Sequence, residues 1–159
     1  MPLEMMLDGG TGIVFTRRFA AAPDRVFRAH TDCALLKRWM YGWEGWSLAR
    51  CDYDARPGGT MLFRWEPGAD AEGEAFEMTG EILEIEPPRR IVHVERMHLG
   101  ETTPDNRIET TFEPDGDGTL MTMRMSLPSS EMREQMLATG MADGMEASLS
   151  RIDGLFGGA

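Results

Sequence analysis

His93 and Glu95 are the residues whose types and spacing could do acid–base chemistry. They lie two positions apart, so a β-strand would place both side chains on one face, together with Ile91 and Met97. A histidine beside a carboxylate can take up and release a proton when the pair faces a cavity. The opposite strand phase would turn both side chains to solvent. We favour that outcome, but we keep both residues among the candidates for a cavity wall.

The sequence contains none of the common motifs for nucleophiles, phosphates, zinc or dinucleotides. The patterns G-x-S-x-G, G-x-x-x-x-G-K-[ST], H-E-x-x-H and a helix-opening G-x-G-x-x-G are all missing. A metal site needs three or four converging ligands, and one histidine with one glutamate is too few. We therefore predict no catalytic set, no metal and no cofactor. His30, at the end of a short helical segment, is interpreted as an edge residue.

Length and charge limit the classes of protein that the chain can form. The 159 residues predict one domain over 1–159, with residues 1–11 loosely ordered. No apolar run approaches the roughly 20 residues that cross a bilayer. A formal net charge of -11 argues against nucleic acid and against anionic membranes as partners, because both bind through lysine and arginine.

The N-terminal segment and the cysteines indicate the compartment. Residues 1–10 carry Glu4 and Asp8 and lack the basic and apolar regions of a signal peptide, which favours the cytoplasm. Cys33 and Cys51 do not form a C-x-x-C motif. We expect both cysteines to be reduced and buried.

Apolar periodicity predicts the elements that would position these residues. Residues 13–19 alternate as a strand, Pro23 begins a short helix, and Asp32 can cap a second helix over 33–40. Period two then continues through strands near 46–54, 60–66, 75–86, 90–98, 107–113 and 119–127. The connections are short and rich in glycine and proline, which favours antiparallel neighbours.

The C-terminal segment 129–156 has the pattern of one long amphipathic helix. Met141, Met145, Leu149, Ile152 and Phe156 recur at steps of four and three, and Gly157-Gly158 could end the helix. The glycines at positions 140 and 144 would weaken a helix, so they indicate either a close approach to the sheet or extra cavity volume. The pattern predicts an α+β fold, in which a curved antiparallel sheet of about seven strands wraps around this helix.

Four blocks of the sequence resemble proteins similar to the activator of the heat-shock protein 90 ATPase. They occur in the family's order and cover nearly the whole chain. The blocks are Thr16-Arg17-Arg18-Phe19 through Ala22-Pro23 and Val26-Phe27-Arg28-Ala29 to Leu36-Lys37-Arg38-Trp39, Asp52 to Phe63 around Asp54-Ala55-Arg56-Pro57-Gly58-Gly59, Gly80-Glu81-Ile82-Leu83-Glu84-Ile85-Glu86-Pro87-Pro88 with Arg90-Ile91-Val92, and Gly118-Thr119.

The resemblance implies a START-like helix-grip fold of the SRPBCC superfamily, with a cavity between the sheet and the C-terminal helix. That superfamily includes lipid and hormone carriers, cyclases and aromatases, and co-chaperone modules, so the fold implies a cavity rather than a reaction. The chain departs from the family in one respect. Gly144 is followed by Met145, where the family usually has a tryptophan, and methionine makes a thinner and more adaptable wall.

We expect the cavity to bind a small apolar, lipid-like or aromatic molecule. A protein-binding module acting on heat-shock protein 90 and a cavity-based cyclase or hydrolase using His93 and Glu95 are the alternatives. A homodimer is expected from base rates only. The candidate cavity residues are Trp39, Trp43, Phe63, Trp65, Met78, His93, Glu95, Met123, Met141, Met145 and Leu149.

Overall fold

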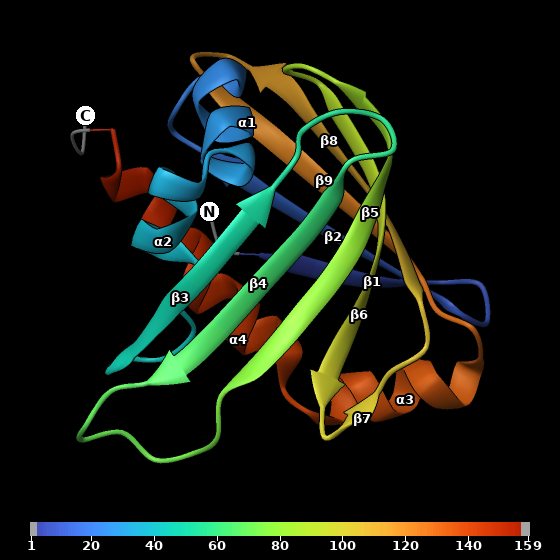
Figure 1. Ribbon diagram of the computed structural model, residues 1–159. Coiled ribbons are helices and arrows are strands. Elements are labelled where there is room, and N and C mark those ends of the chain that lie inside the picture. The colour runs from blue at the N-terminus through green and yellow to red at the C-terminus, as the bar shows by residue number, and fades with distance from the viewer. Residues whose placement is uncertain (1–2, 157–159) are drawn as a thin grey trace.

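A computed structural model describes residues 3–156, and within this range nine strands form one curved antiparallel sheet (Figure 1). The strand order across the sheet is β1-β2-β9-β8-β6-β5-β4-β3, with β7 paired to β6. The strands are β1 (Glu4–Asp8), β2 (Gly12–Phe19), β3 (Trp46–Tyr53), β4 (Thr60–Pro67), β5 (Phe76–Glu86), β6 (Arg90–Leu99), β7 (Glu101–Thr102), β8 (Asn106–Asp115) and β9 (Gly118–Ser126).

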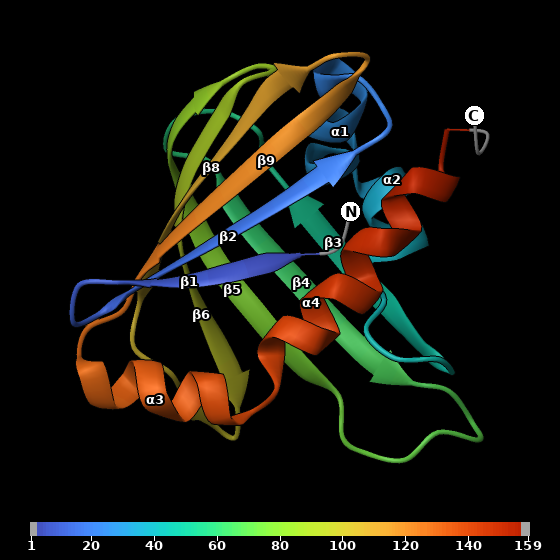
Figure 2. The ribbon, with the colours of Figure 1, turned by 180° about the vertical axis from the view of Figure 1, so that it is seen from behind.

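The helices lie on the inner face and at the two ends of the curved sheet. They are α1 (Pro23–Thr31), α2 (Cys33–Trp39), α3 (Ser130–Ala138) and α4 (Met141–Leu149), followed by the 3-10 turn η1 (Ser150–Gly154). Figures 1 and 2 show α4 crossing the concave face, with α1 and α2 at one end and α3 at the other. The helix-grip fold class is therefore confirmed. No helix in residues 3–156 is long and apolar enough to cross a membrane.

The seven strands expected from period two and the two short helices are confirmed. In β2, residues Ile13, Phe15 and Phe19 face the core while their neighbours are partly accessible. The Asp32 carboxylate accepts a hydrogen bond of 2.9 Å from the Ala34 backbone N–H, as expected for a helix N-cap. Two strands were not expected. They are the two-residue β7 and β1, which pairs with β2 although its side chains are exposed.

The N-terminal prediction is wrong for part of its range, because residues 4–8 of the segment expected to be loosely ordered form β1. Backbone pairing with β2 orders this strand without an apolar pattern of its own. Residues 1–2 of the same prediction lie outside the described residues.

The prediction of one long C-terminal helix over 129–156 is also wrong. The segment forms two helices, because Gly140 between them has the left-handed φ of 76° and interrupts the helical backbone. The segment starts at the expected position, and the Ser129 hydroxyl caps α3 by accepting a hydrogen bond from the Met132 backbone N–H. The expected end at Gly157-Gly158 lies outside the described residues.

The prediction that the cysteines are reduced is contradicted, since Cys33 and Cys51 form a disulfide between α2 and β3. Folding brings their Cα atoms to 5.7 Å, although 18 positions separate them in sequence. Each side chain is partly buried. Disulfides are rare in cytosolic proteins, so this pairing weighs against the cytoplasmic placement expected from the N-terminal segment.

Candidate functional site

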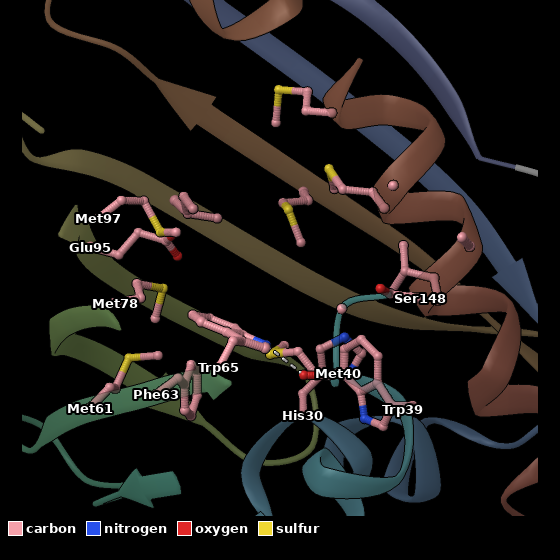
Figure 3. Close-up of a pocket in the computed structure, with 18 of the residues that line it drawn as sticks. His30, Trp39, Met40, Met61, Phe63, Trp65, Met78, Glu95, Met97 and Ser148 are labelled. Atoms are coloured by element: carbon pink, nitrogen blue, oxygen red, sulfur yellow. Dashed lines mark hydrogen bonds between the residues drawn. The ribbon is translucent and has the colours of Figure 1, made fainter. Parts of the chain in front are cut away.

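A cavity of about 550 Å³ lies between the concave face of the sheet and α4. Its wall is mainly apolar, and methionine is its most frequent residue. Unbranched thioether side chains adapt to ligands of different shapes. Figure 3 shows several of them reaching into the space from the strands. The methionines in the wall are Met40, Met61, Met78, Met97, Met123, Met125, Met141 and Met145.

All eleven candidate cavity residues lie in this wall. They come from α2 and the loop after it, from the strands, and from α4. Their role in binding a ligand stays a prediction. The eleven are Trp39, Trp43, Phe63, Trp65, Met78, His93, Glu95, Met123, Met141, Met145 and Leu149.

The aromatic part of the wall is held by hydrogen bonds to the backbone. The Trp65 indole N–H donates to the Met40 carbonyl at 2.8 Å, drawn as a dashed line in Figure 3. The Trp39 indole N–H donates to the Ala29 carbonyl at the same distance. These bonds satisfy the polar edges of both indoles, so their apolar faces can line the cavity. Trp43 is different, because 58% of it is exposed and it lies at the rim against Trp46.

His93 and Glu95 face the cavity rather than solvent, which corrects the strand phase that we favoured. The His93 Nε2 atom lies 2.8 Å from the Glu95 Oε1 atom, and the side chains are 12% and 22% exposed. Ile91 and Met97 line the cavity with them, as the shared strand face predicts. The hydrogen-bonded pair lies within a mainly apolar wall. The His93 Nδ1 atom is buried and has no hydrogen-bond partner in residues 3–156.

His30 is a residue of the cavity wall that sequence reasoning missed, and its interpretation as an edge residue is wrong. Its ring lies 5.1 Å from the Trp39 ring and 5.0 Å from the Phe112 ring, centroid to centroid. Burial lowers the pKa of His30 to about 4, so the ring is neutral at physiological pH. A signal for this position existed, because His30 follows Val26 by four residues and Phe27 by three, on the apolar face of α1.

Tyr53 is a second residue of the wall that was missed. It lines the cavity from the end of β3, and its ring stacks on Phe63 with centroids 6.3 Å apart. Burial raises the pKa of the Tyr53 phenol, so the hydroxyl stays protonated. Its position at the end of a strand carried no apolar pattern that could have identified it.

Helix α4 closes the cavity opposite the sheet. Gly144 lies in the wall, and a Cβ atom built on it would meet no atom within 4 Å in the described part of the chain. Of the two interpretations of this glycine, the structure therefore supports extra cavity volume over close approach to the sheet. Met145 lines the same side, at the position where the family usually has a tryptophan.

The two glycines of this segment are expected to respond in opposite directions to alanine. Gly144→Ala should raise the free energy of unfolding by about 0.5–1 kcal/mol, because alanine is the better helix former and the site has room. Gly140→Ala should lower it by about 1 kcal/mol, because its φ of 76° strains any residue with a Cβ atom. Urea denaturation measures both. If both variants changed the free energy of unfolding in the same direction, the helical conformation of Gly144 and the left-handed conformation of Gly140 would be contradicted.

A cluster of three or more metal-binding side chains does not occur among residues 3–156. The cavity wall thus offers one histidine–glutamate pair, one neutral histidine, the charged side chains of Glu44 and Arg151 and a few hydroxyl groups within a mainly apolar surface.

The curved sheet closing on a C-terminal helix around a cavity defines a START-like helix-grip protein. The family model for the activator of Hsp90 ATPase homolog 1-like protein matches residues 20–157, and the chain belongs to this family. No curated protein matches it.

Solved structures show the same fold. A protein of Rhodobacter sphaeroides is 26% identical with a TM-score of 0.91, and the match covers 100% of each chain. Protein Ms6760 of Mycobacterium smegmatis is 23% identical with a TM-score of 0.84, and the match covers 99% of each chain. CalU16 of Micromonospora echinospora is 24% identical with a TM-score of 0.60, covering 95% of this chain and 83% of that one.

Proposed function

We propose that this protein binds a small, largely apolar molecule in the cavity between the sheet and α4. The observation that carries the proposal is the cavity of about 550 Å³ with its methionine-rich and aromatic wall. Sites for small organic ligands have volumes of roughly 300–1,000 Å³ and are mainly apolar, with a few polar groups that orient the ligand. The wall has that character. Binding of this kind needs no cofactor.

Screening by native mass spectrometry and thermal shift would test the proposal. We expect a lipid, a sterol or an aromatic polyketide to bind at one molecule per chain and to raise the melting temperature. Failure of every class to bind would overturn the proposal.

Met145→Trp is the matched variant for this screen. The larger side chain should fill part of the cavity and weaken binding of any hit about tenfold or more, while the fold is retained. Met6→Trp is the control, because Met6 is exposed on β1, far in the sheet order from β4 and β5, and should leave affinity unchanged. Unfolding of the Met145→Trp protein would instead identify the position as tightly packed core.

A second candidate is a cyclase or hydrolase, favoured by the 2.8 Å hydrogen bond between His93 and Glu95. The carboxylate can only accept, so the His93 Nε2 atom carries the proton and the Nδ1 atom can take up another. Aryl esters are suitable test substrates. Turnover of these esters should fall strongly in Glu95→Gln, with little change in their binding. Equal turnover by the wild type and the variant would rule out this candidate.

Membership of the activator of Hsp90 ATPase homolog 1-like family suggests binding to Hsp90 as an alternative function. Capture of purified Hsp90 by the protein, with a change in its ATPase rate, would support this role. An unchanged rate at high protein concentration would count against it.

A further inference from the structure

Outside the His93–Glu95 pair, the cavity wall contains a second histidine, His30. Its Nδ1 atom lies 2.8 Å from the Val26 carbonyl oxygen, and a carbonyl oxygen can only accept a hydrogen bond. The proton of the neutral ring is therefore on Nδ1. The Nε2 atom is left as a bare acceptor. It is buried and has no hydrogen-bond partner in residues 3–156.

The surroundings of His30 define which ligand group could form a hydrogen bond with its Nε2 atom. The ring belongs to the cavity wall beside Trp39, and Figure 3 shows both on the helix side of the space, across from Met78 and Glu95 on the strands. An unsatisfied buried acceptor is costly, whereas a hydrogen bond made there in apolar surroundings is strong. A ligand group that completes it must be a donor.

The charged groups of the wall disfavour an anionic ligand. The Arg151 guanidinium donates to the Trp39 and Gly42 carbonyls at 2.9 and 3.1 Å and lies over the Tyr41 ring, and these two bonds use two of its five N–H donors. Glu95 adds a carboxylate on the opposite side. An ionised carboxylate at His30 has no hydrogen to donate to the Nε2 lone pair, and among the wall residues the carboxylates of Glu44 and Glu95 outnumber the guanidinium of Arg151.

We propose that the ligand is a neutral hydroxylated aromatic or apolar molecule whose hydroxyl group donates a hydrogen bond to the Nε2 atom of His30. The inference rests on the proposed binding function and specifies its ligand class. The ring systems of Trp39, Phe63 and Trp65 in the wall offer faces on which an aromatic ligand can pack. Fatty acids and other carboxylates are outside this class.

Three probes substituted at the same ring position would test the assignment: naphthol, methoxynaphthalene and naphthoic acid. Tryptophan fluorescence and calorimetry near neutral pH would measure binding to the full chain. We expect naphthol to bind about tenfold or more tightly than methoxynaphthalene, because only the hydroxyl satisfies the acceptor. Naphthoic acid should bind most weakly.

His30→Phe keeps an aromatic ring and removes the acceptor, so naphthol should lose its advantage over methoxynaphthalene in this variant. His98→Phe is the matched control, because His98 bonds to Thr79 and Thr102 and is not part of the cavity wall. The His98→Phe variant should keep the preference of the wild type for naphthol over methoxynaphthalene. Should His30→Phe fail to fold, the nitrogen chemical shift of Nε2 in the wild type reports the same bond, and it must change when naphthol is added.

The outcomes separate this inference from the proposed function. Equal binding of naphthol and methoxynaphthalene, or an unchanged Nε2 shift, would overturn the assignment to His30 and leave cavity binding intact. A second result would also overturn only the assignment to His30: none of the three probes binds, but a lipid binds and its affinity falls in Met145→Trp. No binding of any molecule would overturn both.

Discussion

Glu146→Ala is expected to lower the free energy of unfolding by about 3–5 kcal/mol, because it leaves a buried guanidinium without its main partner. Arg17 on β2 is only 5% exposed, and its Nε and Nη2 atoms donate to the two Glu146 oxygens at 2.9 and 3.1 Å. Its second carboxylate, Asp153, is 3.5 Å away. Because the cavity lies between α4 and much of the sheet, this pair is a direct link between them.

Urea denaturation of Glu146→Ala and of Glu134→Ala would measure the effect. Glu134 is exposed on α3 and belongs to no ion pair in residues 3–156, so the control should change stability by less than about 0.5 kcal/mol. The double variant Arg17→Met/Glu146→Leu should recover most of the loss, since an apolar pair needs no compensating charge. A loss below about 1 kcal/mol in the single variant would show that the pair is not effectively buried.

Acidification is expected to destabilise the protein by about 3 kcal/mol through His30 alone. Burial lowers the pKa of His30 to about 4 in the folded protein, whereas the unfolded chain has the usual value of about 6.5. Above the unfolded value both states are neutral and His30 contributes nothing. Between the two values only the unfolded state takes up a proton, so stability falls as the pH falls, and the loss is complete below pH 4.

Urea denaturation of the wild type and of His30→Phe across this pH range isolates the contribution. Glu81 and Glu146 have pKa values lowered by hydrogen bonds from Arg96 and Arg17, so their protonation also weakens the fold at low pH. That loss is common to both proteins and cancels in the difference. The stability of the wild type relative to the variant should decline below about pH 6.5. A constant difference would mean that His30 can be protonated in the folded protein.

The regular elements of this chain follow from local patterns. Ile108, Thr110 and Phe112 alternate with polar residues and are buried in β8, because a strand turns successive side chains to opposite faces whatever its neighbours are. Asp32 caps α2 for an equally local reason, since its carboxylate reaches a backbone N–H two residues away. Part of the cavity wall was predictable as well, because Met145 and Leu149 share a helix face at any packing angle.

The orientation of β6 could not be predicted from its residues. Both faces of this strand carry apolar side chains, with Ile91 and Met97 on one and Val92 and Val94 on the other. The packing of α4 on one side of the sheet decided which face lines the cavity, and it thereby turned His93 and Glu95 inward. Tertiary packing also decided the burial of His30, because that burial depends on Trp39 and Phe112 from other elements.

The remaining differences come from contacts between distant segments. Gly140 could have continued the helix, and its left-handed backbone instead divides the segment into α3 at one end of the sheet and α4 across its face (Figure 2). Cys33 and Cys51 meet only because α2 packs beside β3. Periodicity therefore determined which elements form and which residues share a face. Only tertiary packing decided which faces meet, and with that the polar groups of the cavity, because their burial and partners belong to several elements at once.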